Sequence, residues 1–475
     1  MLLLTILWIL LPLMVGFSIY LCPKLDRLLT LIMALLSFAY GLGHILLPTP
    51  MTFTLLDTAG ITLMIDELSG FFVITNAIVT VAVTLYCWRQ AQSAFFFTQA
   101  IILHGCVNAI FICSDLISVY VALEVIGIAA FLLVVYPRTD RSIWVGLRYL
   151  FVSNTAMLFY LIGAGLVYQS QRTFAFTAME SAPPIAIALI CLGLLTKGGI
   201  FVSGLWLPLT HSESAAPVSA FLSGVVVKTG VFPLVRFALM IDSLDPLVRM
   251  CGVGTALLGV GFAMFEKDTK RMLAFHTVSQ LGFVLAAPEV GGFYALTHGL
   301  VKSALFLISG NLPSRKFKEL QQTGIATPVW IALAIASFSI SGFPLLSGFG
   351  AKVLTMKNLL PWQVVGMNLA ALGTAISFAK FIFLPRGGEG KVTPAFWQAM
   401  GVLLGGLVLA NMVYYDAYTF GNIVKPLVTI FLGWLMYLFV IQRLPIKWPQ
   451  TVEKFDHLIG VMSLMLLLLL GVGLA

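Results

Sequence analysis

One carboxylate and five lysines lie inside stretches of this sequence that are otherwise apolar enough to cross a bilayer. Glu124 is near the middle of the apolar stretch 116–136. A charge at the centre of a spanning helix costs about 3 kcal/mol on insertion scales, so it faces a partner or water and indicates a functional site. The embedded lysines are Lys197, Lys228, Lys302, Lys352 and Lys380. A carboxylate facing a row of lysines is typical of a membrane protein that moves charge.

The composition excludes an ordinary soluble protein. Of the 475 residues 60% are hydrophobic and 10% charged, with a mean hydropathy of +1.02. In soluble domains about one half of the residues are apolar and about one quarter are charged. The net charge of +8 is spread singly along the loops, so it does not indicate nucleic-acid binding. The six cysteines lack CxxC spacing, and no Walker loop or GxGxxG motif follows a strand. We therefore expect no metal, cofactor or nucleotide site.

Apolar runs of about 17 to 25 residues predict sixteen spans, with an uncertainty of about two, and hence an all-α polytopic membrane protein with 14–16 transmembrane helices. The predicted spans are 2–21, 28–47, 68–88, 93–113, 116–136, 143–168, 184–208, 216–240, 250–265, 272–288, 292–312, 327–346, 364–385, 396–415, 423–441 and 457–475. The first run is too long for the core of a cleaved signal peptide.

The loop charges orient these spans. Of the 27 Lys and Arg residues, seventeen fall in loops on one side and five in loops on the other. Because cytoplasmic loops hold the excess of basic residues, we expect both termini outside. We expect an integral protein of the bacterial inner (plasma) membrane or of a thylakoid-type membrane.

Two predicted spans are interrupted by Gly and Pro beside a lysine. The seventh has Lys197 directly before Gly198 and Gly199, and the twelfth ends in SGFPLLSGFGAK, whose last residue is Lys352. Interrupted helices at corresponding places in two halves indicate the binding site of a transporter. Gly and Pro are also common in spanning helices, but a lysine beside each break favours a functional interpretation.

Glu124 and Lys197 form the first candidate constellation. Burial disfavours the charged forms of both groups and pairing favours them, so a small change in their separation can release or take up a proton near neutral pH. The alternative is a static buried ion pair, although such pairs are poor stabilisers. Lys228 lies midway along its span, too deep to reach the interface, and we interpret it as a further proton carrier.

Tyr294, His298 and Lys302 are spaced four residues apart and therefore share one helical face. Histidine exchanges protons near neutrality, so we interpret this stripe as a hydrogen-bonded relay rather than as one structural histidine. Secondary candidates that could line an entry path are His211, Glu213 and His276.

Four segments resemble the antiporter-like subunits of respiratory complex I and its relatives, which include the D-type subunits of Mrp cation/proton antiporters and the membrane subunits of group 4 hydrogenases. The segments are WLPLTHSESAAPVSAFLSGVVVKTGVFPLVR (206–236), KRMLAFHTVSQLG (270–282), THGLVKSALFLISG (297–310) and FPLLSGFGAKVL (343–354). The lysine followed by Val-Leu in the last segment, together with Lys380, is most similar to the Mrp D type. The residues around His211 are closer to the complex I and hydrogenase pattern.

The resemblance implies a single membrane domain, 1–475, with an ion-translocating core at 92–386. This core would hold two inverted five-helix repeats, at about 92–240 and 250–386, and residues 1–91 and 387–475 would form peripheral helices. The resemblance also implies proton-transfer roles for matching residues, namely Glu124, Lys197, Lys228, His298, Lys302 and Lys352.

We therefore expect an ion-translocating subunit of a multisubunit cation (sodium)/proton antiporter, with no redox site of its own. Its partners would be other membrane subunits, protons, sodium and the lipid bilayer. One alternative is a proton-pumping subunit of a complex I-like oxidoreductase, using NAD(P)H or ferredoxin with quinone, or of a membrane-bound hydrogenase. A second alternative is a scaffold subunit that conducts nothing, although a scaffold has no reason to keep five buried lysines.

Overall fold

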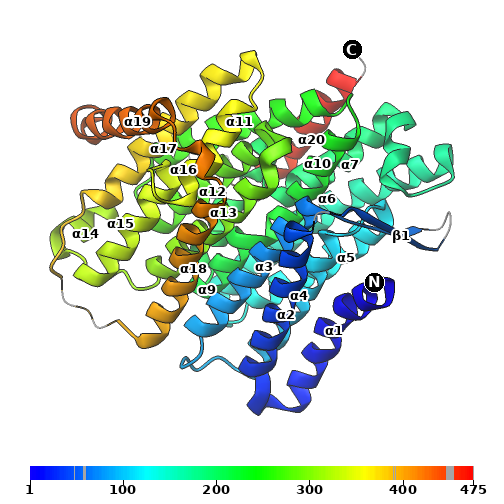
Figure 1. Ribbon diagram of the computed structural model, residues 1–475, viewed down its shortest axis with the longest axis horizontal. Coiled ribbons are helices and arrows are strands. Elements are labelled where there is room, and N and C mark those ends of the chain that lie inside the picture. Colours follow the sequence, from blue (N-terminus) through cyan, green and yellow to red (C-terminus); the bar gives the residue numbers. More distant parts are fainter. Residues whose placement is uncertain (48, 57–59, 389, 391, 445–453, 474–475) are drawn as a thin grey trace.

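The structure is a helical bundle with one small hairpin (Figure 1). The computed structural model describes residues 1–475 except 48, 57–59, 389, 391, 445–453 and 474–475. The helices are α1 (Leu2–Leu21), α2 (Asp26–Leu46), α3 (Glu67–Tyr86), α4 (Ala94–Ile110), α5 (Leu116–Val134), α6 (Asp140–Gln171), α7 (Pro184–Gly198), α8 (Leu207–Glu213), α9 (Ala216–Phe221), α10 (Lys228–Met240), α11 (Asp245–Phe265), α12 (Thr269–Ala286), α13 (Gly291–Ser309), α14 (Phe317–Thr323), α15 (Thr327–Ser341), α16 (Ser347–Lys357), α17 (Val364–Ile382), α18 (Pro394–Val413), α19 (Phe420–Phe439) and α20 (Phe455–Gly473). Short helical turns join several of them.

Each of the sixteen predicted spans overlaps one of these helices, so the all-α polytopic fold is confirmed. Among the described residues, 11 helices are long and apolar enough to cross a membrane, or up to 12 if the bent pair α7 and α8 is one span. Helices α4 and α15 are short apolar helices that fall outside this count. The end of the last predicted span, 474–475, and the basic residues Lys391 and Lys447 used for orientation lie outside the described residues.

Two of the segments that carry embedded bases, those with Lys228 and Lys302, lie at the centre of the bundle. The spanning windows of 216–240, which contains α9 and α10, and of 288–309, which contains α13, are 100% buried within the chain. Peripheral helices are much more exposed, since the windows of α1 and α18 are each 28% buried. An apolar helix that is hydrophobic all round is the kind found in a protein core. The division of residues 92–386 into two inverted repeats stays a prediction.

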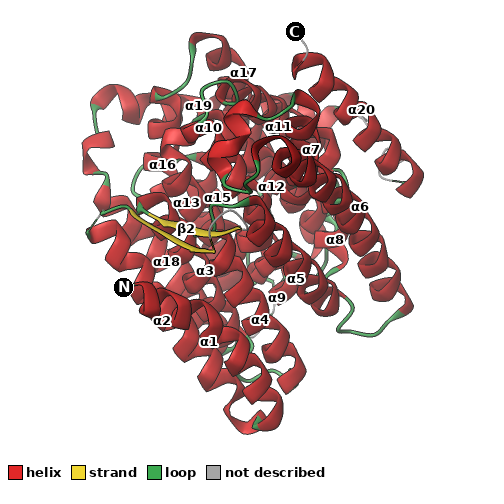
Figure 2. Ribbon diagram, turned by 90° about the vertical axis from the view of Figure 1, so that its right-hand side faces the viewer, coloured by secondary structure: helices red, strands yellow, loops and turns green. Residues whose placement is uncertain are grey.

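A β-hairpin interrupts the helices between α2 and α3, where we expected only a connection between spans. Strand β1 (Met51–Leu56) pairs antiparallel with β2 (Gly60–Ile65), drawn yellow in Figure 2. The hairpin is also hydrogen-bonded to the α4–α5 loop, since the Met64 N–H donates to the Ile112 carbonyl at 2.7 Å. The alternation of Thr with apolar residues in β1 is a strand pattern.

Both predicted helix breaks are present, and both use a glycine in the left-handed region. Gly199, directly after α7, has φ 69°, and Gly342, directly after α15, has φ 86°. Only glycine adopts such angles at little cost. After the first break, α7 and the segment Phe201–Glu213 meet at 41°. The Trp206 indole N–H donates to the Thr196 carbonyl at 2.8 Å, which satisfies a backbone group near the end of α7.

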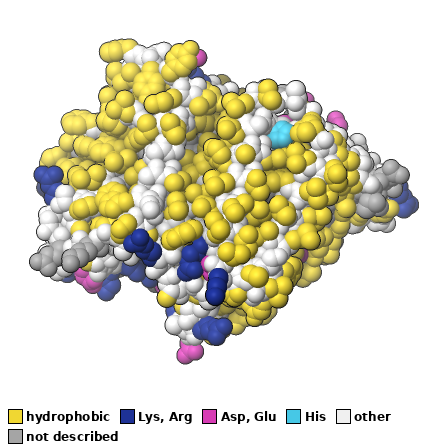
Figure 3. All heavy atoms as spheres, turned by 60° about the horizontal axis from the view of Figure 1, so that its bottom comes forward, with side chains coloured by type: hydrophobic (Ala, Val, Ile, Leu, Met, Phe, Trp, Pro, Cys, Tyr) yellow, Lys and Arg dark blue, Asp and Glu magenta, His cyan; other side chains and the backbone are white. Residues whose placement is uncertain are grey.

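Charge is distributed unevenly over the surface. Figure 3 shows a broad hydrophobic surface with Lys and Arg side chains gathered along its lower edge. Two arginines predicted on the opposite, sparsely charged side are held by carboxylates. Arg236 donates to both carboxylate oxygens of Asp66, and Arg249 binds Asp245 and Glu289. Burial raises the pKa of Asp66. The hydrogen bonds and the charge of Arg236 lower it by more than this, so the pKa lies below the usual value for an aspartate.

Candidate functional site

Glu124 and Lys197 come from two helices that meet at α6. Glu124 is half-buried on α5, and Lys197 is buried in the last turn of α7, where the helix dipole favours a cation. The Lys197 ammonium donates to the Ser153 hydroxyl of α6 at 2.6 Å. Glu124 is near enough for its charge to act on Lys197, but no ion pair within 4.0 Å joins them among the described residues. The predicted partners are therefore close, with Ser153 as a third member that the sequence did not reveal.

Lys228 is held by the backbone of its own helix. The turn Leu222–Val226 between α9 and α10 is a π-helix, a rare form that is frequent at functional sites. The fully buried Lys228 ammonium donates to the Gly224 carbonyl at 2.6 Å and to the Ser223 carbonyl at 3.2 Å. This lysine therefore has hydrogen-bond acceptors but, among the described residues, no carboxylate beside it. Nothing in the letters SGVVVK distinguishes a π turn from an α turn.

The stripe on α13 is only partly a connected relay. His298 is buried, and neither ring nitrogen has a hydrogen-bond partner in the described part of the chain. The charges of Lys228 and Lys302 both act on His298. Lys302 donates to the Leu273 carbonyl of α12. Tyr294 does not bind His298, because its hydroxyl donates to Gln280 on α12 at 2.7 Å.

His276 lies deeper than its predicted position at an entrance. Helix α12 begins at Thr269, so His276 is two turns inside the helix and fully buried. Its ring packs against Phe378 with 4.7 Å between ring centroids. The charges of three lysines, Lys302, Lys352 and Lys380, act on it. His276 thus belongs to the middle of the candidate path.

His211 and Glu213 occupy different depths of α8. Glu213 forms surface ion pairs with Arg141 at 3.4 Å and Arg315 at 3.6 Å. His211 is fully buried, and both of its ring nitrogens lack a partner within the described residues. The charge of Lys302 acts on His211. Glu213 therefore lies among surface arginines, and His211 lies near the buried Lys302.

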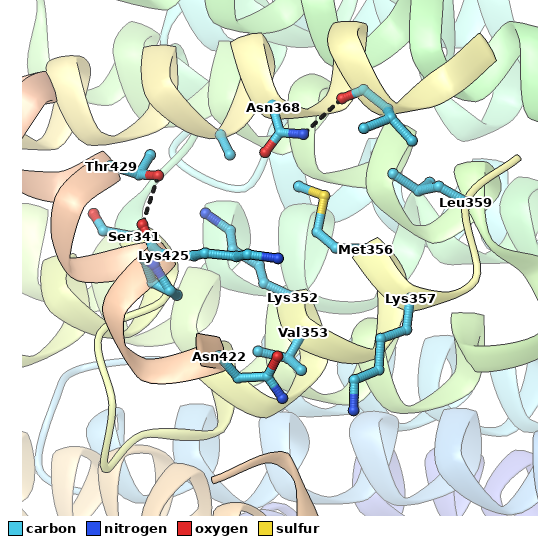
Figure 4. Close-up of a pocket in the computed structure, with 13 residues that line it drawn as sticks. Ser341, Lys352, Val353, Met356, Lys357, Leu359, Asn368, Asn422, Lys425 and Thr429 are labelled. Carbon is cyan, nitrogen blue, oxygen red and sulfur yellow. Dashed lines mark hydrogen bonds between the residues drawn. The ribbon is translucent and has the colours of Figure 1, made fainter. Parts of the chain in front are cut away.

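Lys352 and Lys380 each line a cavity, and the two cavities lie at opposite ends of α17. Lys380 lines a cavity of about 340 Å³ beside Glu266 and Lys267, and its ammonium donates to the Glu266 carbonyl at 2.9 Å. Lys352 lines a cavity of about 220 Å³ with Lys357 and other residues, shown in Figure 4. The Lys352 ammonium is buried and has no hydrogen-bond partner among the described residues.

The side chains brought together are of types that can pass protons. Lysine and histidine each gain and lose one proton, and hydroxyls such as Ser153 both donate and accept. The described residues contain no group of three His, Cys, Asp or Glu side chains able to hold a metal ion. The arrangement is a series of buried bases from α5 and α7, through α10, α13 and α12, to α16.

Comparison with known proteins gives the family. Residues 113–377 match the family model described as "NADH:quinone oxidoreductase/Mrp antiporter, TM". The N-type subunit of the NADH-quinone oxidoreductase of Desulforudis audaxviator is 28% identical over 68% of this chain and 72% of its own length. The D-type subunit of the Na(+)/H(+) antiporter of Alkalihalophilus pseudofirmus is 27% identical over 70% of this chain and 75% of its own length.

Solved structures share the fold. A chain of the archaeal membrane-bound sulfane sulfur reductase is 20% identical with a TM-score of 0.77, covering 92% of this chain and 99% of that chain. A chain of the Mrp complex from Dietzia sp. DQ12-45-1b is 18% identical with a TM-score of 0.74, covering 96% of this chain and 98% of that chain. With more than half of its length matched by the family model, this chain belongs to the NADH:quinone oxidoreductase/Mrp antiporter membrane-subunit family.

Proposed function

We propose that this chain is the proton-carrying subunit of a multisubunit antiporter that exchanges sodium for protons. Protons would move along Glu124, Lys197, Lys228, His298, Lys302 and Lys352, with His276 between the last two lysines. Lys380, His211 and Glu213 would connect this path to the basic face. The complex would lie in a bacterial inner membrane with other membrane subunits as its partners.

One observation carries the proposal: the three buried bases in the middle of the series, Lys228, His298 and Lys302, have no carboxylate beside them among the described residues. Lys228 and Lys302 donate only to backbone carbonyls in the described part of the chain, and His298 has no partner there. Buried charges that serve stability are paired, because an unpaired one costs several kcal/mol. Groups left without a counter-charge are instead suited to changing their protonation state.

A redox-driven proton pump is the second candidate. It is favoured because this chain is 28% identical to the subunit of the NADH-quinone oxidoreductase and 27% identical to the subunit of the antiporter, so sequence identity does not separate the two. The same proton path would serve either machine, because the driving reaction lies in other subunits. A scaffold that conducts nothing is disfavoured by the buried bases.

The test uses the whole complex, expressed with its partner subunits in cells that lack their own sodium/proton antiporters. Everted membrane vesicles are energised, and the collapse of the pH gradient after sodium addition is followed with a fluorescent probe. His298→Ala and Lys302→Ala should each lower the rate at least about tenfold, because each removes a site that accepts the proton. The double variant should be little worse than the worse single variant, since both interrupt one path.

The matched control is Lys318→Ala, which removes an exposed lysine of α14, and complex abundance is measured for every variant. Losses that multiply in the double variant would mean that the two residues do not serve one path. The redox pump would be favoured by two results together: vesicles show no sodium-dependent proton movement, and the purified complex contains flavin or iron–sulfur subunits. Full activity of well-assembled His298→Ala and Lys302→Ala would leave only the scaffold.

A further inference from the structure

The cavity at Lys352 is lined by three lysines and by no acidic residue. Lys352 and Lys357 come from α16 and Lys425 from α19, and the described residues around the cavity include no Asp or Glu. In Figure 4 the side chains of Lys352 and Lys425 extend into the space between α16 and α19, and Lys357 lies to one side. The amides Asn368 and Asn422 also line this space.

The three lysines differ in their access to water. Lys357 and Lys425 are exposed, so water screens their charges. Lys352 is 7% exposed, and its ammonium has no hydrogen-bond partner among the described residues. Its nitrogen lies 5.5 Å from the centre of the Phe283 ring, which accepts no full hydrogen bond at that distance. A buried ammonium with free N–H donors, aimed at a polar cavity, is satisfied by an acceptor that enters from outside.

We propose that this cavity is a binding site for an oxyanion of the phosphate class, held by Lys352 and Lys425, with Lys357 at the rim adding positive charge. Ammonium groups bind phosphate as point charges through short, charge-assisted hydrogen bonds. A volume of about 220 Å³ holds such a group together with several waters. Sodium is a poor occupant, because three positive side chains repel it.

The ligand has two sources with the same chemistry, a free phosphate ion or the headgroup of an anionic lipid. The cavity lies beside α19, whose spanning window is only 17% buried. On the neighbouring surface Val365 and Leu369 of α17 are 71% and 55% exposed, and Phe431 of α19 is 60% exposed. A lipid could therefore place its chains on this apolar surface while its phosphate enters the cavity.

The test measures binding by the purified complex in mild detergent. One arm uses radiolabelled inorganic phosphate in equilibrium dialysis. The other uses native mass spectrometry with phosphatidylglycerol, against phosphatidylcholine of the same chain length. We expect wild type to retain phosphate or phosphatidylglycerol in preference to phosphatidylcholine, and the arm that responds identifies the source.

Lys425→Gln should weaken this binding at least about tenfold, because it removes one charge-assisted contact, and Lys425→Arg should restore it. Lys357→Gln is a second variant that also leaves Lys352 intact, and Lys318→Gln is the control for net charge. The proposal is overturned if wild type prefers neither anion, or if Lys318→Gln weakens binding as much as Lys425→Gln. It is also overturned if the free chain binds the anion and the assembled complex does not, since a neighbouring subunit then fills the cavity.

Discussion

Gly127 provides the space that lets the Lys197 ammonium reach Ser153. A Cβ atom at residue 127 would lie 3.0 Å from the Lys197 nitrogen and 3.4 Å from the Ser153 hydroxyl oxygen. Gly127 is on α5, one turn beyond Glu124. Gly127→Ala therefore places a methyl group against the ammonium without changing any charge.

The expected effect follows from these distances. Carbon and nitrogen atoms in contact are usually about 3.5 to 4.0 Å apart, so the ammonium must move by about 0.5 to 1 Å. The 2.6 Å bond to Ser153 is then stretched to the limit of a hydrogen bond or beyond it. Losing a hydrogen bond to a charged group costs about 1.5 to 3 kcal/mol, which is about 10- to 100-fold in the rate of a step that depends on it.

The assay is sodium-dependent proton movement in everted vesicles, with the amount of assembled complex measured in the same membranes. Gly165→Ala in α6 is the control, because a Cβ there meets no atom within 4 Å. We expect Gly127→Ala to assemble normally and to transport slowly, and Gly165→Ala to behave as wild type. Normal transport by a well-assembled Gly127→Ala protein would refute the idea that the Lys197–Ser153 contact is part of the path.

Three further predictions concern other parts of the chain. Cysteines placed at 138–141, where the chain enters α6, and at 315–318 should react with a cytoplasmic thiol reagent, because these segments carry part of the excess of basic residues; protection of either segment would contradict the expected orientation. Glu124→Gln should assemble but lose most transport, whereas Glu124→Asp should retain a substantial share; failure to assemble would instead indicate a static ion pair. Asp66→Asn should lower the free energy of unfolding by about 3 kcal/mol at neutral pH, because it leaves the buried Arg236 charge without its partner. The pKa of Asp66 is lowered in the folded protein. The greater stability of wild type should therefore disappear as the pH falls below about 4, the usual pKa of an aspartate, and then through the lowered pKa. A difference in stability that persists in acid would contradict the ion-pair explanation.

The helices and both breaks were predictable because a bilayer imposes a length and a composition on every span. The breaks were predictable for a local reason, since Gly199 and Gly342 supply backbone angles that other residues avoid. The hairpin β1–β2 was missed because a search for long apolar runs passes over two strands of six residues.

The candidate site was predictable in its ionisable residues and not in their partners. A buried lysine is visible in a sequence because its charge is expensive, but a hydroxyl such as Ser153 is common in spanning helices. The π turn before Lys228 depends on packing between helices. In the sequence Lys425 is only a loop charge that helps to orient the chain, because the folded structure alone brings it beside Lys352.

The two cavities at the ends of α17 also determine where the membrane voltage acts. Asn368 lines one cavity and Lys380 lines the other, and twelve helical residues separate them by about 18 Å. Water that enters a cavity conducts, so the electrical potential falls mainly across the dry protein between the two cavities. A proton that crosses this gap experiences most of the membrane potential, worth about 2.3 kcal/mol per 100 mV. The voltage dependence of transport would therefore arise around the fully buried His276.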